Sequence, residues 1–156
     1  MAFLLSSIFA NAAFGQSATV LGNDNTLLAE GSASLAAGRH EEGIRLTLAG
    51  LEQPNNPRDE AAAHSNLCAG YAALKRWSEA LPHCNRSLEL DRRNWHTFNN
   101  RAAVFVGLGH YELAVADVNA GLALDPDSDT LRKSLEVVHE HRNAARRDRR
   151  KRSTTT

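Results

Sequence analysis

The chain has 156 residues, of which 42% are hydrophobic, 6% aromatic and 23% charged, and its formal net charge is zero. This composition is too hydrophobic for an intrinsically disordered chain, and the length suits one ordinary domain. Abundant Ala, Leu, Glu and Arg with few aromatic residues favour helices over strands.

The first fifteen residues carry no charged side chain. Small residues stand at the spacing of a signal-cleavage site, at Ala10 and Ala12 or just before Gln16. This pattern predicts a secretory signal peptide over residues 1–15 and a linker over residues 16–23. No basic residue precedes the apolar run, which leaves a cytoplasmic protein with a loose N-terminal segment as the alternative. We therefore expect a periplasmic or secreted protein.

The remainder of the chain repeats with a period of 34 residues. Residues 61–94 align without a gap on residues 95–128, so that Ala80 falls on Ala114, and a weaker copy covers residues 24–60. A fixed period of this length is typical of helical repeat proteins.

Each copy contains two helical patterns separated by a break, at Gly38, at Lys75 and at Gly109. Such a pattern predicts one helical hairpin per copy. The loop before Ala61 contains two prolines and two asparagines, so we place the boundary between the first two copies after residue 60.

A last helix is expected after Ser128, a residue type that caps helices well. Leu131, Leu135 and Val138 then recur at helical spacing, which predicts a capping helix over residues 129–145. The segment 146–156 is strongly basic and is predicted to be a flexible tail.

At matching places of the 34-residue period, the second repeat has Leu67, Tyr71, Ala80 and Leu88, and the third has Phe98, Ala102, Phe105, Ala114 and Pro126. These residues resemble the signature of the tetratricopeptide repeat (TPR) family. The resemblance implies an all-α, right-handed α-solenoid of about three helical hairpins with a C-terminal capping helix. The first repeat is degenerate, since Gly43 stands where the other two have the small alanine.

The resemblance also implies a concave groove, lined by the first helix of each repeat, that binds a peptide or protein segment. Asn66 and Asn100 occupy the same place one repeat apart, and an Asn amide can both donate to and accept from a peptide backbone. They could equally be solvated helix surface without a binding role. The expected groove residues are Ser65, Asn66, Ala69, His96, Asn99, Asn100 and Ala103.

One subclass of the family binds a C-terminal carboxylate with Lys and Arg in this groove. The chain departs from that subclass, and the resemblance therefore speaks against an Hsp70 or Hsp90 co-chaperone. The corresponding places hold Leu28, Ser32, Asn66, His96 and Asn100.

Arg101 stands where the preceding repeat has Leu67, at a normally apolar place. Asp117 lies at a similar height on the antiparallel partner helix of the hairpin. We predict an Arg101–Asp117 ion pair with a structural role.

The two cysteines, Cys68 and Cys84, lie at similar heights on the two helices of the second repeat. They could form a disulfide in an oxidising compartment, but we favour two reduced, buried cysteines. A zinc site formed with His64 and His83 is not expected, because the usual ligand spacings are missing. We expect no metal, no cofactor and no small-molecule substrate.

No catalytic motif is present: there is no Ser-His-Asp grouping in a known context, no glycine-rich phosphate loop and no His-Glu-x-x-His. We therefore expect a non-enzymatic scaffold or adaptor for an unknown protein or peptide partner, in the bacterial cell envelope. A second reading is association with nucleic acid or an anionic membrane surface, because nine bases face three acids from Arg132 onward. A third is self-assembly through the solenoid ends.

Overall fold

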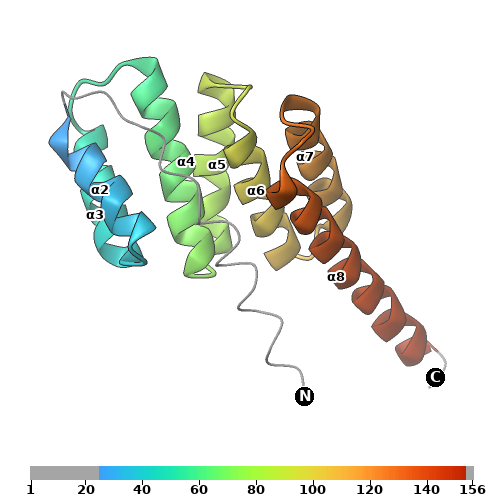
Figure 1. Ribbon diagram of the computed structural model, residues 1–156. Helices are drawn as coiled ribbons and strands as arrows, with labels where there is room; N and C mark the ends of the chain where they lie inside the picture. Colours follow the sequence, from blue (N-terminus) through green and yellow to red (C-terminus); the bar gives the residue numbers. More distant parts are fainter. Residues whose placement is uncertain (1–24, 154–156) are drawn as a thin grey trace.

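The computed structural model describes residues 25–153, so the predicted signal peptide and linker lie outside the described residues. The described part is entirely helical and contains no strand, which confirms the all-α fold class. Three helical hairpins stack side by side, and a last helix packs on the third (Figure 1). None of these helices has the length and apolarity needed to cross a membrane. The helices are α2 (Thr26–Ala36), α3 (His40–Leu51), α4 (Pro57–Ala73), α5 (Trp77–Leu90), α6 (Trp95–Gly107), α7 (Tyr111–Leu124) and α8 (Asp129–Ser153).

The hairpin turns lie at the three predicted breaks. Gly38, Lys75 and Gly109 have φ angles of 77°, 58° and 78°, all in the left-handed region. In the third turn the His110 N–H donates to the Phe105 carbonyl at 2.8 Å, and the first two turns contain the equivalent bond. A residue in the left-handed region, followed by a backbone N–H that donates to the carbonyl five residues earlier, is a common way to end a helix and reverse the chain.

The first helix of each hairpin begins at an asparagine cap. The side chains of Asn25, Asn56 and Asn94 accept hydrogen bonds from backbone N–H groups in the first turns of α2, α4 and α6. The predicted boundary after residue 60 is wrong, because α4 already begins at Pro57. Proline suits the first position of a helix, where its missing N–H would have no partner within the helix.

The two helices of each hairpin approach most closely at small residues. Ala80 and Ala114 are fully buried at the places predicted for close contact. In the first hairpin a Cβ added at Gly43 would lie 2.5 Å from Leu35 Cγ and 2.8 Å from the Leu35 backbone nitrogen. The α2–α3 hairpin is thus packed too closely for alanine at residue 43, which explains why this repeat departs from the family pattern.

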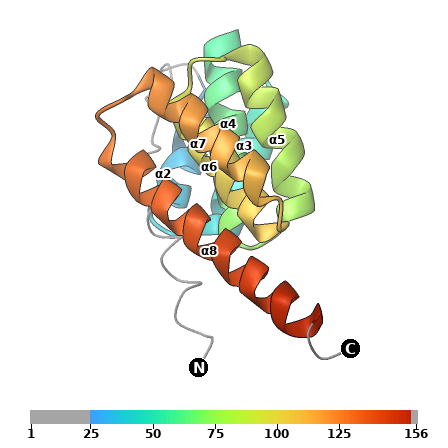
Figure 2. The same ribbon diagram turned by 90° about the vertical axis from the view of Figure 1, so that its right-hand side faces the viewer.

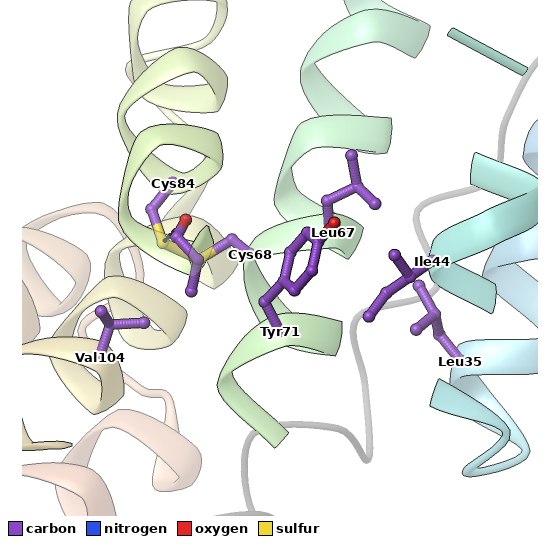
Figure 3. Close-up of a cluster of buried hydrophobic side chains, with 8 residues drawn as sticks. Leu35, Ile44, Leu67, Cys68, Tyr71, Cys84 and Val104 are labelled. Carbon is purple, nitrogen blue, oxygen red and sulfur yellow. Dashed lines mark hydrogen bonds between the residues drawn. A yellow bond between two sulfur atoms is a disulfide. The ribbon is translucent and has the colours of Figure 1, made fainter. Parts of the chain in front are cut away.

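One core cluster joins the first two hairpins and reaches the third (Figure 3). Within it a disulfide links Cys68 on α4 to Cys84 on α5, with 5.0 Å between the two Cα atoms. The structure thus has a covalent link between these helices rather than two reduced thiols. The cluster consists of Leu35, Ile44, Leu67, Cys68, Tyr71, Ala80, Cys84 and Val104.

A second core cluster holds α8 against the third hairpin, through the fully buried Leu131 and Val138. The prediction that a flexible tail begins at residue 146 is wrong over the described residues, because α8 continues to Ser153. Arg and Lys are good helix formers, and their positive charge is favourable near a helix C-terminus. Arg142 and Arg146 also pair with Glu112 on α7, at 3.1 and 3.2 Å.

The ion pair expected between Arg101 and Asp117 is present. The Arg101 guanidinium donates to both carboxylate oxygens, from Nε at 2.8 Å and from a terminal nitrogen at 2.7 Å. The Asp117 side chain is 8% exposed and the Arg101 side chain 21%. Arg101 also donates to Asn85 Oδ1 at 2.8 Å, so this one side chain connects α6 with α7 and α5.

Candidate functional site

The first helices of the hairpins form one row and the second helices another. In the first row α4 packs directly against both α2 and α6, whereas α3, α5 and α7 make their main contacts with neighbouring first helices or with α8. The first helices thus approach one another more closely than the second helices do, so α2, α4 and α6 form the inner row of the stack. The inner side of a curved repeat stack is the surface that such proteins use for binding.

The groove residues predicted on this row are less accessible than expected. Asn66, Asn99 and Asn100 are 5%, 5% and 1% exposed, and Ser65, Ala69 and Ala103 are also buried. The expectation of an exposed face is therefore wrong for these six residues, and His96 alone among the seven predicted residues is partly exposed. The reason is the direct packing of α4 on its neighbours, which the small residues along these helices permit.

Ser65 belongs to a buried chain of hydroxyl groups rather than to a binding surface. The Ser87 hydroxyl donates to the Ala61 carbonyl at 2.9 Å and accepts from the Thr97 hydroxyl at 2.9 Å. Thr97 Oγ1 lies 2.8 Å from Ser65 Oγ, within hydrogen-bond distance. The chain links α4, α5 and α6, and each of the three hydroxyls is at most 1% exposed. Sequence reasoning missed Ser87 and Thr97, because their places are polar in only one repeat junction.

Two asparagines on α6 have buried side-chain atoms without hydrogen-bond partners among the described residues. Within residues 25–153, Asn99 Oδ1 and both polar atoms of Asn100 are buried without a partner. A buried amide that lacks partners costs about 1–3 kcal/mol of folding free energy. Such groups call for an explanation, and a bound ligand is one that would supply the missing partners.

A pocket of about 250 Å³ opens at the end of the row where α4 and α6 begin. Its polar wall includes Arg58 and Arg93, both exposed and without an ion pair among the described side chains. Its aromatic wall is the stacked pair Trp95 and His96, with ring centroids 3.7 Å apart. The complete lining is Arg58, Ala61, Ala62, Asp91, Arg93, Asn94, Trp95 and His96.

The chemistry of the pocket favours a ligand with a negative group. Burial lowers the pKa of His96, although Asp125 partly opposes this effect, so the imidazole is neutral at pH 7. The positive charge of the wall therefore comes from the two arginines, with Asp91 as the one acidic residue in the lining. Sequence reasoning missed Arg58 and Arg93 because both lie outside the family signature. Arg58 is in the first turn of α4, and Arg93 is in the loop before α6.

A second polar cluster lies between α4 and α5. The Nδ1 atoms of His64 and His83 are 2.9 Å apart, and His83 stacks on Tyr71 with ring centroids 5.5 Å apart. Burial, and after it the neighbouring His64, lowers the pKa of His83 to about 4. In residues 25–153 no three His, Cys, Asp or Glu side chains converge in a way that could hold a metal ion.

No known family profile matches the chain. It is 33% identical over 110 residues to the wheat (Triticum aestivum) "Hsp70-Hsp90 organizing protein", a match over 69% of this chain and 18% of the relative. It is 29% identical over 109 residues to mouse (Mus musculus) "Sperm-associated antigen 1", over 70% of this chain and 12% of the relative. The chain thus spans less than a fifth of the length of these relatives.

Solved structures settle the fold. The Hsp90 co-chaperone Cns1 from Saccharomyces cerevisiae superposes with a TM-score of 0.71 at 19% identity, over 83% of this chain and 43% of that chain. The first TPR of Spaghetti (RPAP3), bound to the HSP90 peptide SRMEEVD, superposes with a TM-score of 0.66 at 23% identity, over 77% and 94%. The fold is a TPR helical solenoid.

Proposed function

We propose that this chain is a non-enzymatic adaptor that binds an extended peptide or protein segment along α4 and α6. The observation that carries the proposal is the set of three unpartnered amide atoms on Asn99 and Asn100, next to an open pocket on the same helix. A peptide backbone supplies donors and acceptors at regular spacing and would give these amides the partners they lack.

The ligand would enter from the pocket. His96 lies one helical turn before Asn100, about 6 Å along α6, because a helix rises about 1.5 Å per residue. An extended peptide advances about 3.3 Å per residue, so two residues of ligand span that distance. Asn100 is almost fully buried, so the side chains that cover it must move before a peptide can reach its amide. Such side-chain rearrangements are common at binding interfaces.

The residue held in the pocket is expected to be acidic. Arg58 and Arg93 could pair with a carboxylate in the pocket. The small side chains of Ala61 and Ala62, which also line the pocket, leave room for the side chain that carries it. The peptide bound by the Spaghetti TPR, SRMEEVD, is rich in carboxylates. Arg58 and Arg93 do not occupy the groove positions at which the carboxylate-binding subclass has Lys and Arg. They could nevertheless bind the same kind of ligand, a peptide with carboxylate groups.

The test is peptide binding, measured by fluorescence anisotropy with labelled SRMEEVD and with a version whose acidic side chains are replaced by amides. Asn66→Ala with Asn100→Ala should weaken both peptides at least tenfold. Arg93→Ala should weaken only the acidic peptide, and Arg92→Ala is the matched control, since Arg92 is also exposed but does not line the pocket. Unchanged binding of both peptides by the asparagine double variant would remove the groove from the proposal.

The compartment is a separate part of the proposal. A disulfide between Cys68 and Cys84 suits an oxidising compartment such as the periplasm or the secretory pathway. This supports export, which we expect from the N-terminal pattern, while the bacterial setting stays a prediction. The protein is purified from the organism that naturally produces it. Thiol titration after denaturation should find no free thiol, and N-terminal sequencing should find a chain that begins near residue 13 or 16. Two free thiols and an intact N-terminus would contradict export.

A further inference from the structure

The second half of α8 is a strongly cationic helix. From Arg142 to Ser153 it carries seven Arg or Lys residues and one acidic residue, Asp148. All residues from Arg146 to Ser153 are exposed. In both views the end of α8 extends beyond the stacked hairpins (Figures 1 and 2). The charge is therefore held on a helix.

The cations surround the helix instead of forming one stripe. Arg142, Arg146 and Arg149 face the start of α7, where they line a second pocket of about 330 Å³. Since a helix turns about 100° per residue, Arg147 points to another side. A flat acidic surface can contact only one side of such a helix. The major groove of a B-form DNA duplex is wide enough for an α-helix, and it presents a phosphate chain on each side of a helix that lies within it.

The described end of α8 also lacks the features of a membrane-binding helix. After Ala145 no residue up to Ser153 is apolar, so no apolar face exists that could enter the lipid headgroup region. Phosphates of a duplex, by contrast, are bound by charge alone, and the released counterions supply the free energy.

We propose that the second half of α8 binds the phosphate backbone of double-stranded DNA without reading its sequence. This surface lies at the opposite end of the stack from α2, and it is independent of peptide binding along α4 and α6. An adaptor with both surfaces would bring a peptide-bearing partner to a nucleic acid.

The experiment measures the affinity of the full chain for a labelled 20-base-pair DNA duplex between 50 and 200 mM salt. If about four phosphates are neutralised, log K falls with log salt at a slope of about −3.6, and the affinity drops about 150-fold over this range. A variant with Arg146→Gln, Arg147→Gln and Arg149→Gln should lose most of this slope. The matched control removes three exposed charges that line neither pocket, by Arg45→Gln, Lys75→Gln and Arg92→Gln, and should bind like the unaltered chain.

Three results would overturn the proposal. The first is no binding of the unaltered chain at 50 mM salt, which needs no variant and so does not depend on variant folding. The second is equal weakening by the α8 variant and its control, with both shown to be folded by circular dichroism. The third is tighter binding to vesicles with 30% phosphatidylserine than to the duplex at the same salt concentration, which would identify a membrane surface instead.

Discussion

Replacing Arg101 by leucine removes both hydrogen bonds to the Asp117 carboxylate, which is 8% exposed. An almost buried carboxylate without its partner costs about 3–5 kcal/mol of folding free energy. Since the Arg101 side chain is 21% exposed, water can reach the vacated space, and we expect the lower end of that range, about 3 kcal/mol. The preceding repeat has Leu67 at the equivalent place, so leucine itself fits there.

The pair is measured by a double-mutant cycle with Arg101→Leu, Asp117→Ala and the double variant, each unfolded in urea and followed by circular dichroism. Arg101 also contacts Asn85 and the rings of Phe98 and Phe105. Those contacts are lost whether or not Asp117 is present, so they cancel in the cycle. We expect a coupling of about 2 kcal/mol or more. A coupling below about 0.5 kcal/mol would show that the two side chains contribute independently and would refute the reasoning.

Three further predictions concern the turns, the disulfide and the histidine pair. Lys75→Gly should raise the free energy of unfolding by about 0.5–1 kcal/mol, because Lys75 holds a left-handed φ that glycine adopts without cost, while Gly109→Ala should lower it by a similar amount; urea unfolding of both tests the turn geometry. Reducing the disulfide that joins Cys68 and Cys84 should cost about 3 kcal/mol, as expected for a closed loop of about 15 residues, and a urea midpoint that dithiothreitol leaves unchanged would contradict a formed bond. The pKa of His83 is lowered to about 4 in the folded chain against 6.5 in the unfolded chain, so the unfolded chain binds more protons between these values. Stability should therefore be complete above pH 6.5 and fall as the pH drops toward 4, by about 1–2 kcal/mol after allowance for partial exposure, and His83→Gln should flatten this dependence in urea titrations at several pH values.

Agreement between sequence and structure is best where the information is local. The hairpin turns at Gly38, Lys75 and Gly109, and the close contacts at Ala80 and Ala114, depend on residues within one 34-residue period. The Arg101–Asp117 pair follows from the same logic, since two antiparallel helices joined by a short turn place these positions at one height. The physical reason is that a helical hairpin is determined by its own turn and its own helical spacing.

The end of α8 and the state of the cysteines were harder to foresee. The strongly basic composition from residue 146 onward predicted that the helix ends at residue 145. A helix needs no apolar face, however, where its residues are good helix formers and its charges find partners such as Glu112. Helical spacing places Cys68 and Cys84 close together whether they are reduced or bonded. Whether they form a disulfide depends on the distance between their Cα and Cβ atoms, which helical spacing alone does not fix.

The sequence by itself determined the repeat, the helical hairpins, the solenoid class and the ion pair within the third repeat. Only the tertiary structure decided which residues are accessible, because accessibility depends on how closely one hairpin packs on the next. That packing buries Asn66, Asn99 and Asn100, uses Ser65 in a hydroxyl chain with Thr97, and leaves a pocket between Arg58 and Arg93. These features arise between repeats, where no single period of the sequence contains both partners.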